Sequence, residues 1–243
     1  MDTLIGHEKL YVYQAGLKFI SWSQSAFDEI ESSMIVLDHW SRAADSVVEN
    51  IANGNTRRSR CDRNHYFNIA IGSALESAAC LDICHCRHML SNRQLHIGKN
   101  ILKSVVNMTI KLRDSKSDYI REMSEEYISD PYFSHEKLDA YKVALELIVW
   151  FDKLLEATQI NTGYAKRLDK STTSLVLNIA EGNGRFSDAE QIRFLDIAQN
   201  SAIRTGVCLD ILSTKFGTNI DNGKNILARI VPLILGLRNR LDA

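Results

Sequence analysis

The chain contains one sequence unit twice, and this internal repeat restricts its fold more than any other feature. His7-Glu-Lys-Leu10 matches His135-Glu-Lys-Leu138, so the two units are offset by 128 residues. The longest matched block sets Ser46 to Arg57 against Ser174 to Arg185 at the same offset. A repeat of this length is typical of one supersecondary unit that occurs in two tandem copies.

Each copy is expected to form four helices. Apolar residues at alternating spacings of three and four place one apolar stripe along the first helix. The stripe residues are Leu10, Tyr13, Leu17, Ile20 and Phe27 in copy one, and Leu138, Tyr141, Leu145, Ile148 and Leu155 in copy two. With only two prolines in the chain, the sequence predicts an all-α protein of two tandem antiparallel four-helix bundles, residues 1–128 and 129–243.

The turn between the second and third helices carries a repeated motif. Gly54 and Gly182 follow the second helix, where a left-handed C-terminal residue is usual. Ser187 begins the third helix as an N-cap, with Glu190 three residues later. Asparagine and arginine side chains can satisfy backbone groups at helix ends. Seven residues are therefore predicted to hold this turn together: Asn50, Gly54, Asn178, Glu181, Gly182, Arg185 and Ser187.

Composition and charge exclude several classes of protein. Apolar residues make up 45% and charged residues 24% of the chain, which is typical of a globular protein. The net charge of −1 means that any basic surface for nucleic acid must be local. The N-terminus lacks signal-peptide character and no apolar run is as long as a membrane span requires, so we expect a cytoplasmic protein with no membrane partner. Five cysteines in no framework spacing predict reduced thiols.

A cluster of arginines in copy one is the strongest candidate binding site. Arg57, Arg58, Arg60 and Arg63 surround the turn into the third helix, and we expect all four to be exposed on one rim. Their planar guanidinium groups suit phosphate or an acidic partner. The alternative is a solvated turn with local salt bridges.

Metal binding and catalysis find little support. Cys80, Cys84 and His88 share one helical face and could be imagined as zinc ligands. Because Cys80 recurs as Cys208 without the other two, a buried core thiol is the simpler interpretation. Nucleophile elbows, phosphate-binding glycine loops and zinc-protease motifs are all missing. We therefore predict no metal, no cofactor and no enzyme activity.

The second copy resembles a known family. The segments Asn178-Ile-Ala-Glu-Gly-Asn-Gly-Arg185 and Phe194-Leu-Asp-Ile-Ala198 are similar to those of the bacterial four-helix-bundle proteins encoded in intervening sequences of large-subunit ribosomal RNA genes. Copy one departs from this pattern at Asn53 and Thr56. It is connected to the family mainly through the repeat.

This resemblance implies a left-handed bundle without catalytic activity, frequently assembled into a ring of five subunits. One branch of the family comprises the accessory variability determinants of diversity-generating retroelements, which bind a reverse transcriptase and nucleic acid through a basic surface. The resulting hypothesis is a non-catalytic adaptor for RNA, DNA or a reverse-transcriptase-type protein, with self-association or ring assembly. The alternative is a structural oligomerisation scaffold that does not bind nucleic acid.

Overall fold

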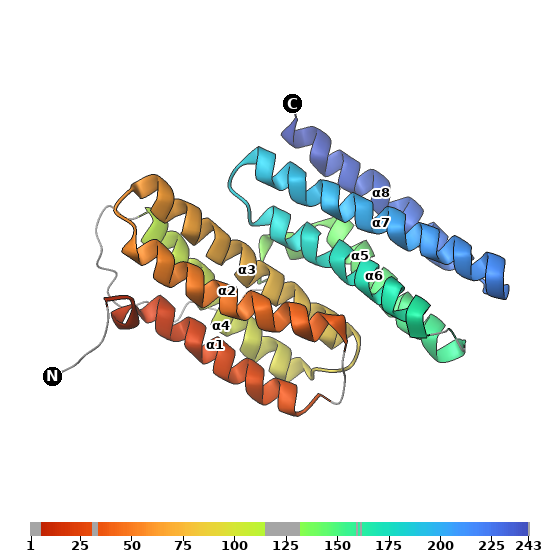
Figure 1. Ribbon diagram of the computed structural model, residues 1–243, viewed down its shortest axis with the longest axis horizontal. Helices are drawn as coiled ribbons and strands as arrows, with labels where there is room; N and C mark the ends of the chain where they lie inside the picture. The colour runs from red at the N-terminus through yellow and green to blue at the C-terminus, as the bar shows by residue number, and fades with distance from the viewer. Residues whose placement is uncertain (1–5, 31–33, 115–131, 159, 161, 243) are drawn as a thin grey trace.

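The computed structural model describes residues 6–30, 34–114, 132–158, 160 and 162–242, and it shows two helical bundles side by side (Figure 1). Copy one consists of η1 (Gly6–Lys9), α1 (Tyr11–Asp28), α2 (Ile35–Thr56), α3 (Arg60–Cys86) and α4 (Asn92–Asp114). Copy two consists of η2 (Ser134–Lys137), α5 (Asp139–Ala157), α6 (Thr162–Asn183), α7 (Asp188–Phe216) and α8 (Asp221–Leu241). The described residues contain no strand, and the predicted fold class is confirmed.

Equivalent serines cap the start of the third helix in each copy, as predicted for Ser187. The Ser187 hydroxyl accepts a hydrogen bond from the Glu190 amide at 3.2 Å, and Ser59 accepts one from the Asp62 amide at 3.4 Å. Each hydroxyl satisfies an amide that the first helical turn leaves without an intrahelical partner. The Glu190 carboxylate accepts a bond from the Ser187 hydroxyl at 3.3 Å.

Gly54 and Gly182 are helical residues, and their prediction as left-handed C-terminal residues is wrong. They lie inside α2 and α6, and neither has a positive φ. A Cβ on Gly54 would lie 2.6 Å from Cε1 of Phe67, and one on Gly182 would lie 2.9 Å from Cβ of Phe194. Glycine is needed here because the second helix approaches a phenylalanine of the third helix too closely for a side chain.

Asn50 and Asn178 also lie inside the second helix of each copy, whereas the prediction placed them in the turn. The Asn178 amide nitrogen donates to the backbone carbonyl and the hydroxyl of Ser174 at 2.7 and 3.1 Å. The Ser174 hydroxyl lies 2.9 Å from that of Ser201 on α7, which connects the two helices. Asn50 makes the same two bonds to Ser46 at the same distances. The repeat is thus preserved down to individual hydrogen bonds.

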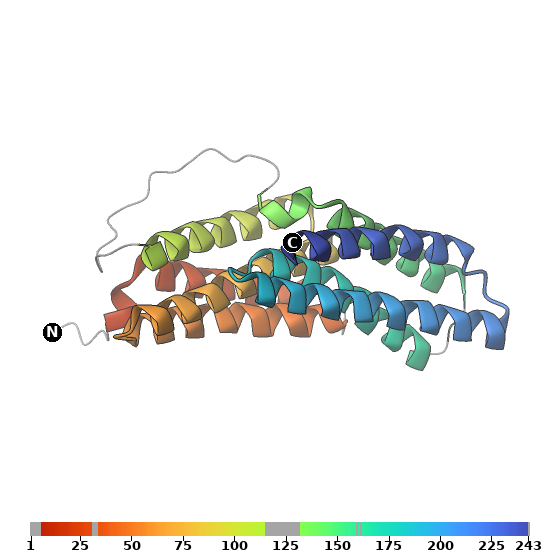
Figure 2. The same cartoon turned by 90° about the horizontal axis from the view of Figure 1, so that it is seen from above.

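The two bundles pack on each other through α3 of copy one and α5 and α6 of copy two (Figures 1 and 2). Because α3 contacts its own bundle on one side and copy two on the other, its residues from Ala70 to Cys84 are buried apart from the partly exposed Glu76. The buried apolar residues of both copies form one continuous core. The boundary predicted at residues 128 and 129 lies outside the described residues.

Helix α3 is long and apolar enough to cross a membrane by length and composition, although no apolar run of that kind was expected from the sequence. It is the one such helix in the part of the chain that the structure describes. However, 83% of the most apolar 18-residue stretch of α3 is buried inside the protein. Such burial is typical of a core helix.

Candidate nucleic-acid interface and the joint between the bundles

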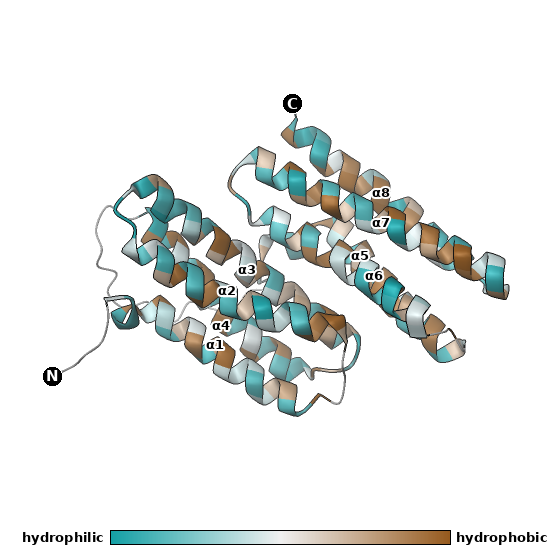
Figure 3. Ribbon diagram, viewed as in Figure 1, coloured by the Kyte–Doolittle hydropathy of each residue, from teal (hydrophilic) through white to brown (hydrophobic). Residues whose placement is uncertain are grey.

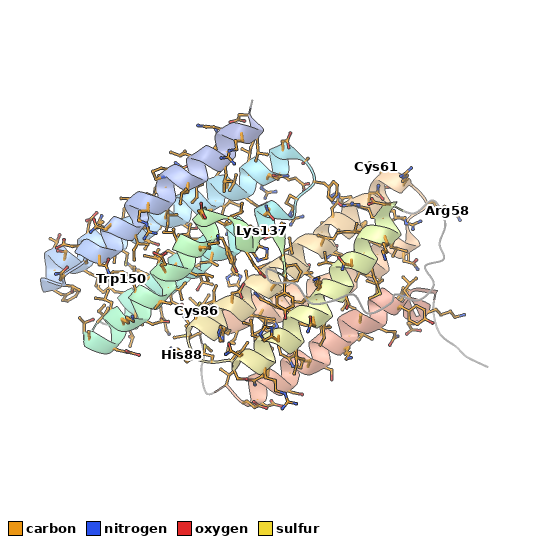
Figure 4. All side chains as sticks on the ribbon, turned by 180° about the vertical axis from the view of Figure 1, so that it is seen from behind. Arg58, Cys61, Cys86, His88, Lys137 and Trp150 are labelled. Carbon is orange, nitrogen blue, oxygen red and sulfur yellow. The ribbon has the colours of Figure 1, made fainter. Side chains whose placement is uncertain are left out.

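The turn between α2 and α3 carries three exposed arginines, Arg57, Arg58 and Arg60. Figure 4 shows Arg58 at the outer end of copy one, away from copy two, and Figure 3 shows this end as hydrophilic. Arg57 donates from Nη2 to the hydroxyl of Tyr66 at 2.9 Å, and its guanidinium carbon lies 4.7 Å from the centre of that ring. An aromatic partner holds the guanidinium in place and leaves it charged and able to bind phosphate.

Arg63 does not share this exposure, contrary to the prediction for all four arginines. Its Nη2 donates to the carbonyl oxygen of Leu112 at 3.0 Å, and its guanidinium lies 5.5 Å from the ring centre of Phe67. Because Arg63 precedes the buried Phe67 by one helical turn, both lie on the face of α3 that packs on its own bundle. Leu112 belongs to the last turn of α4, whose carbonyls lack helical partners. Arg63 therefore anchors the end of α4.

The last turn of α4 contributes further charges to this end. Lys111 and Asp114 are exposed there. Hydrogen bonding from Arg113, followed by the charges of Arg113 and Arg60, lowers the pKa of Asp114. The three exposed arginines and Lys111 outnumber the exposed carboxylates of Asp62 and Asp114 at these helix ends. Among the residues that the structure describes, this end of copy one therefore carries more exposed basic than acidic side chains, although the whole chain is nearly neutral.

Arg185, the equivalent of Arg57, is buried where the two bundles meet. It forms an ion pair with Glu181, and its guanidinium packs against Gly72 of copy one. Burial and the charge of Glu76 on α3 raise the pKa of Glu181, while Arg185 opposes them. The arginine at this position of the motif is therefore exposed to solvent in copy one, as Arg57, and buried against the other bundle in copy two, as Arg185.

A buried group of charges, here called the ionic joint, connects the copies and was not predicted. Nζ of Lys99 on α4 lies 2.5 Å from Oδ1 of Asp82 on α3 and 2.9 Å from Oε1 of Glu136 in η2. Tyr141 on α5 donates its hydroxyl to Asp82 at 2.8 Å. The Lys99 side chain is 6% exposed and each carboxylate 12%. Burial lowers the pKa of Lys99, but the two carboxylates outweigh it and raise that pKa, so the side chain is an ammonium.

Arg87 makes a further contact between the bundles. Its Nη2 lies 2.7 Å from Oδ1 of Asp169, and its Nε lies 3.3 Å from Oδ2 of Asp152. Asp152 interrupts the apolar stripe of α5, and this ion pair explains why a carboxylate occurs there. Burial raises the pKa of Asp152, and Arg87 opposes that shift.

His135, beside the ionic joint, is fully buried. Neither ring nitrogen has a hydrogen-bond partner within the described part of the chain. The ring stacks on Phe133 and meets Tyr141 edge to face, with ring centres 5.8 and 4.7 Å apart. Burial and the charge of Lys99 lower the pKa of His135 to about 3, so the imidazole is neutral.

This histidine should make stability depend on pH. The pKa of His135 is about 3 in the folded protein and about 6.5 in the unfolded chain. Between these values the unfolded chain binds a proton that the folded protein does not bind. The contribution of His135 to stability is therefore fully present above pH 6.5 and is lost as the pH falls below that value. Going from pH 7 to pH 5 should lower the unfolding free energy by about 2 kcal/mol through His135 alone. Urea denaturation of His135→Leu should lack this loss, and His7→Leu in copy one should retain it. Equal pH dependence in His135→Leu and the wild type would contradict the assignment.

His88, one of the three residues considered as zinc ligands, lies near the end of copy one opposite to Arg58, where Figure 4 labels both. Cys80 and Cys84 are buried, and burial raises both thiol pKa values, to about 12 for Cys84. His88 is exposed beyond the helix end. Since the thiolate is the form that binds metal, the geometry supports core packing for both cysteines.

Another group of possible metal ligands lies in the ionic joint. One ligand atom each from Asp82, His135 and Glu136 lie within 4.8 Å of one another. The Lys99 ammonium bonds both carboxylates. The chain therefore supplies the cation of this cluster itself.

These features define a class of protein: a duplicated helical scaffold whose buried polar contacts join helices and bundles, with one basic end. A family model described as 23S rRNA-intervening sequence protein matches residues 8–111 and, separately, residues 136–234. The chain belongs to this family and contains two tandem copies of the family's domain, as the resemblance predicted. This family is not known to be enzymatic. No curated protein and no solved structure matches the chain.

Proposed function

We propose that this protein is a non-catalytic adaptor that binds the phosphate groups of RNA through Arg57, Arg58 and Arg60. The supporting observation is the exposure of these three guanidinium groups at one end of a nearly neutral chain. Copy two has Phe186 and Asp188 at the positions of Arg58 and Arg60, so the basic end belongs to copy one. Arginine forks match phosphate oxygens, and such contacts dominate affinity without requiring a general basic excess.

The family resemblance makes a reverse-transcriptase-type protein a further partner of the proposed adaptor. Its RNA would contact the arginine end, and the protein would bind alongside.

Replacing Arg57, Arg58 and Arg60 together by alanine should weaken binding of a fluorescein-labelled single-stranded RNA by about tenfold or more at low salt. Three lost phosphate contacts should also reduce the slope of log affinity against log salt by about 2. The unfolding midpoint should hardly change, because exposed charges contribute little to stability. Fluorescence anisotropy at several salt concentrations and a thermal melt measure the two effects.

A matched control removes the same charge elsewhere. Lys166, Arg167 and Lys170 are exposed on α6, and their triple alanine variant should keep the wild-type affinity to within a small factor. If both triple variants lose affinity equally, binding depends on net charge and the arginine end is not the site. If neither loses affinity, the proposal is wrong.

A purely structural oligomerisation scaffold is the second candidate. Ile203 and Val207 on α7 are each 52% exposed, which is unusual for apolar side chains one helical turn apart. Self-association without any RNA binding would favour this function.

A further inference from the structure

A contact between an arginine and an aromatic ring recurs in both copies at the turn into the third helix. The guanidinium carbon of Arg57 lies 4.7 Å from the ring centre of Tyr66. That of Arg185 lies 4.6 Å from the ring centre of Phe194. These residues are equivalent, since the same offset of 128 relates both pairs. The repeat therefore contains this arginine–ring pair twice, in two different surroundings.

In copy two the other bundle covers the arginine–ring pair, and the contact shows which kind of surface the pair accepts. A Cβ built on Gly72 of α3 would lie 3.1 Å from Cζ and 3.2 Å from both Nε and Nη2 of Arg185. A point that is nearest to the carbon and equally distant from two nitrogens lies over the guanidinium plane. Gly72 thus covers the flat face of the guanidinium, where its missing side chain allows close approach.

In copy one the equivalent pair faces solvent and has lost a counter-charge. Arg57 is exposed and Tyr66 is partly exposed. Glu181, which forms an ion pair with Arg185 in copy two, corresponds to Asn53 in copy one. An uncharged side chain therefore occupies the position from which a carboxylate neutralises the buried arginine.

A second aromatic ring joins the pair in copy one. His65 is exposed on α3, and its ring meets that of Tyr66 edge to face, with centres 5.7 Å apart. In copy two Arg193 occupies this position. The Tyr66 hydroxyl accepts the hydrogen bond from Arg57 at 2.9 Å, which fixes the guanidinium relative to the ring. Copy one thus presents two rings and one guanidinium plane together.

A ligand that fits this surface carries flat rings and negative charges at short intervals. Unpaired bases of single-stranded RNA stack on aromatic side chains and on arginine planes, while their phosphates bind basic groups. Arg58 and Arg60 are exposed next to Arg57 in the same turn. Inside a duplex both faces of a base are already stacked on its neighbours, so a duplex offers the arginines its phosphates alone.

We propose that Arg57, Tyr66 and His65 form a subsite for an unpaired base, so that the protein binds single-stranded RNA in preference to duplex RNA. This inference rests on the proposed function, in which Arg58 and Arg60 bind the flanking phosphates. Duplexes have the higher charge density, and phosphate contacts by themselves favour them. A preference for the single strand therefore reports the contact with a base.

Fluorescence anisotropy with fluorescein-labelled oligouridine, as a single strand and as its duplex with oligoadenylate, tests this proposal at one salt concentration. The wild type should bind the single strand about tenfold more tightly. Tyr66→Leu should weaken binding of the single strand by about tenfold and leave binding of the duplex unchanged. Tyr66→Phe keeps the ring and removes the hydroxyl, so it should keep the preference. Thermal melts establish that both variants are folded.

Tyr164→Leu is the matched control, because Tyr164 on α6 has the same kind of partners. The guanidinium carbon of Arg167 lies 5.6 Å from its ring centre, and Lys215 donates to its hydroxyl at 3.0 Å. This variant should bind both RNAs as the wild type does. Equal affinity of the wild type for both RNAs would overturn the base subsite. Equal losses in Tyr66→Leu and Tyr164→Leu would do the same.

The base subsite and the proposed function fail in different ways. If the triple alanine variant of Arg57, Arg58 and Arg60 weakens binding of both RNAs and Tyr66→Leu weakens neither, the arginine end binds phosphates and the base subsite is wrong. If the wild type binds neither RNA, both are wrong.

Discussion

Replacing Lys99 by methionine should lower the unfolding free energy by about 3 to 5 kcal/mol, because it leaves two buried carboxylates without their counter-charge. Asp82 and Glu136 come from different copies, and both lie within 2.9 Å of the Lys99 ammonium. Methionine retains much of the side-chain length, so the loss reflects charge more than volume. Urea denaturation with a fitted m-value measures the change.

Lys224 is the matched control, since it forms the equivalent ion pair at the surface. Its pair with Asp210 is 37% exposed on the lysine and 61% on the carboxylate. Lys224→Met should therefore change the unfolding free energy by no more than about 1 kcal/mol. If Lys99→Met and Lys224→Met lower the unfolding free energy equally, the ionic joint stabilises the protein no more than an exposed ion pair does.

Adding one methyl group at Gly98 or Gly223 should lower stability by about 1 to 3 kcal/mol in each case. A Cβ on Gly98 would lie 2.6 Å from Cζ3 of Trp22, and one on Gly223 would lie 2.5 Å from Cζ3 of Trp150, which is labelled in Figure 4. The tryptophan is packed in both copies and cannot move away without disturbing its neighbours.

Gly236→Ala tests whether the effect comes from crowding or from the loss of glycine itself. Gly236 lies in α8, and a Cβ there would have no neighbour within 4 Å. Alanine should therefore raise the unfolding free energy by about 0.5 to 1 kcal/mol, as its helix propensity predicts. A similar loss at all three glycines, measured by thermal unfolding, would contradict the packing account.

The repeat and the helical periodicity were enough to predict the eight helices and their duplication. Spacing did not show how closely the helices approach, however. Gly54 follows an apolar helix and precedes a turn, so its sequence position resembles that of a C-terminal cap. Its actual role depends on the Phe67 ring, which belongs to a different helix and which no local pattern locates.

The contacts between the copies could not be predicted from the sequence for a related reason. Lys99 and Lys224 occupy equivalent positions in nearly identical segments, and one is buried while the other is partly exposed. What separates them is the neighbouring bundle, which covers one copy alone. Arg63 shows the same limit on a smaller scale, because its direction on α3 decides whether it meets solvent or α4.

The most direct test of the proposed function is hydrogen exchange of the wild-type protein with and without saturating RNA, followed by mass spectrometry. We expect slower exchange at residues 55–64, around Arg57, Arg58 and Arg60, and unchanged exchange in the equivalent segment 183–192 of copy two. Protection of both segments alike, or of the α7 face in place of the arginine end, would contradict it.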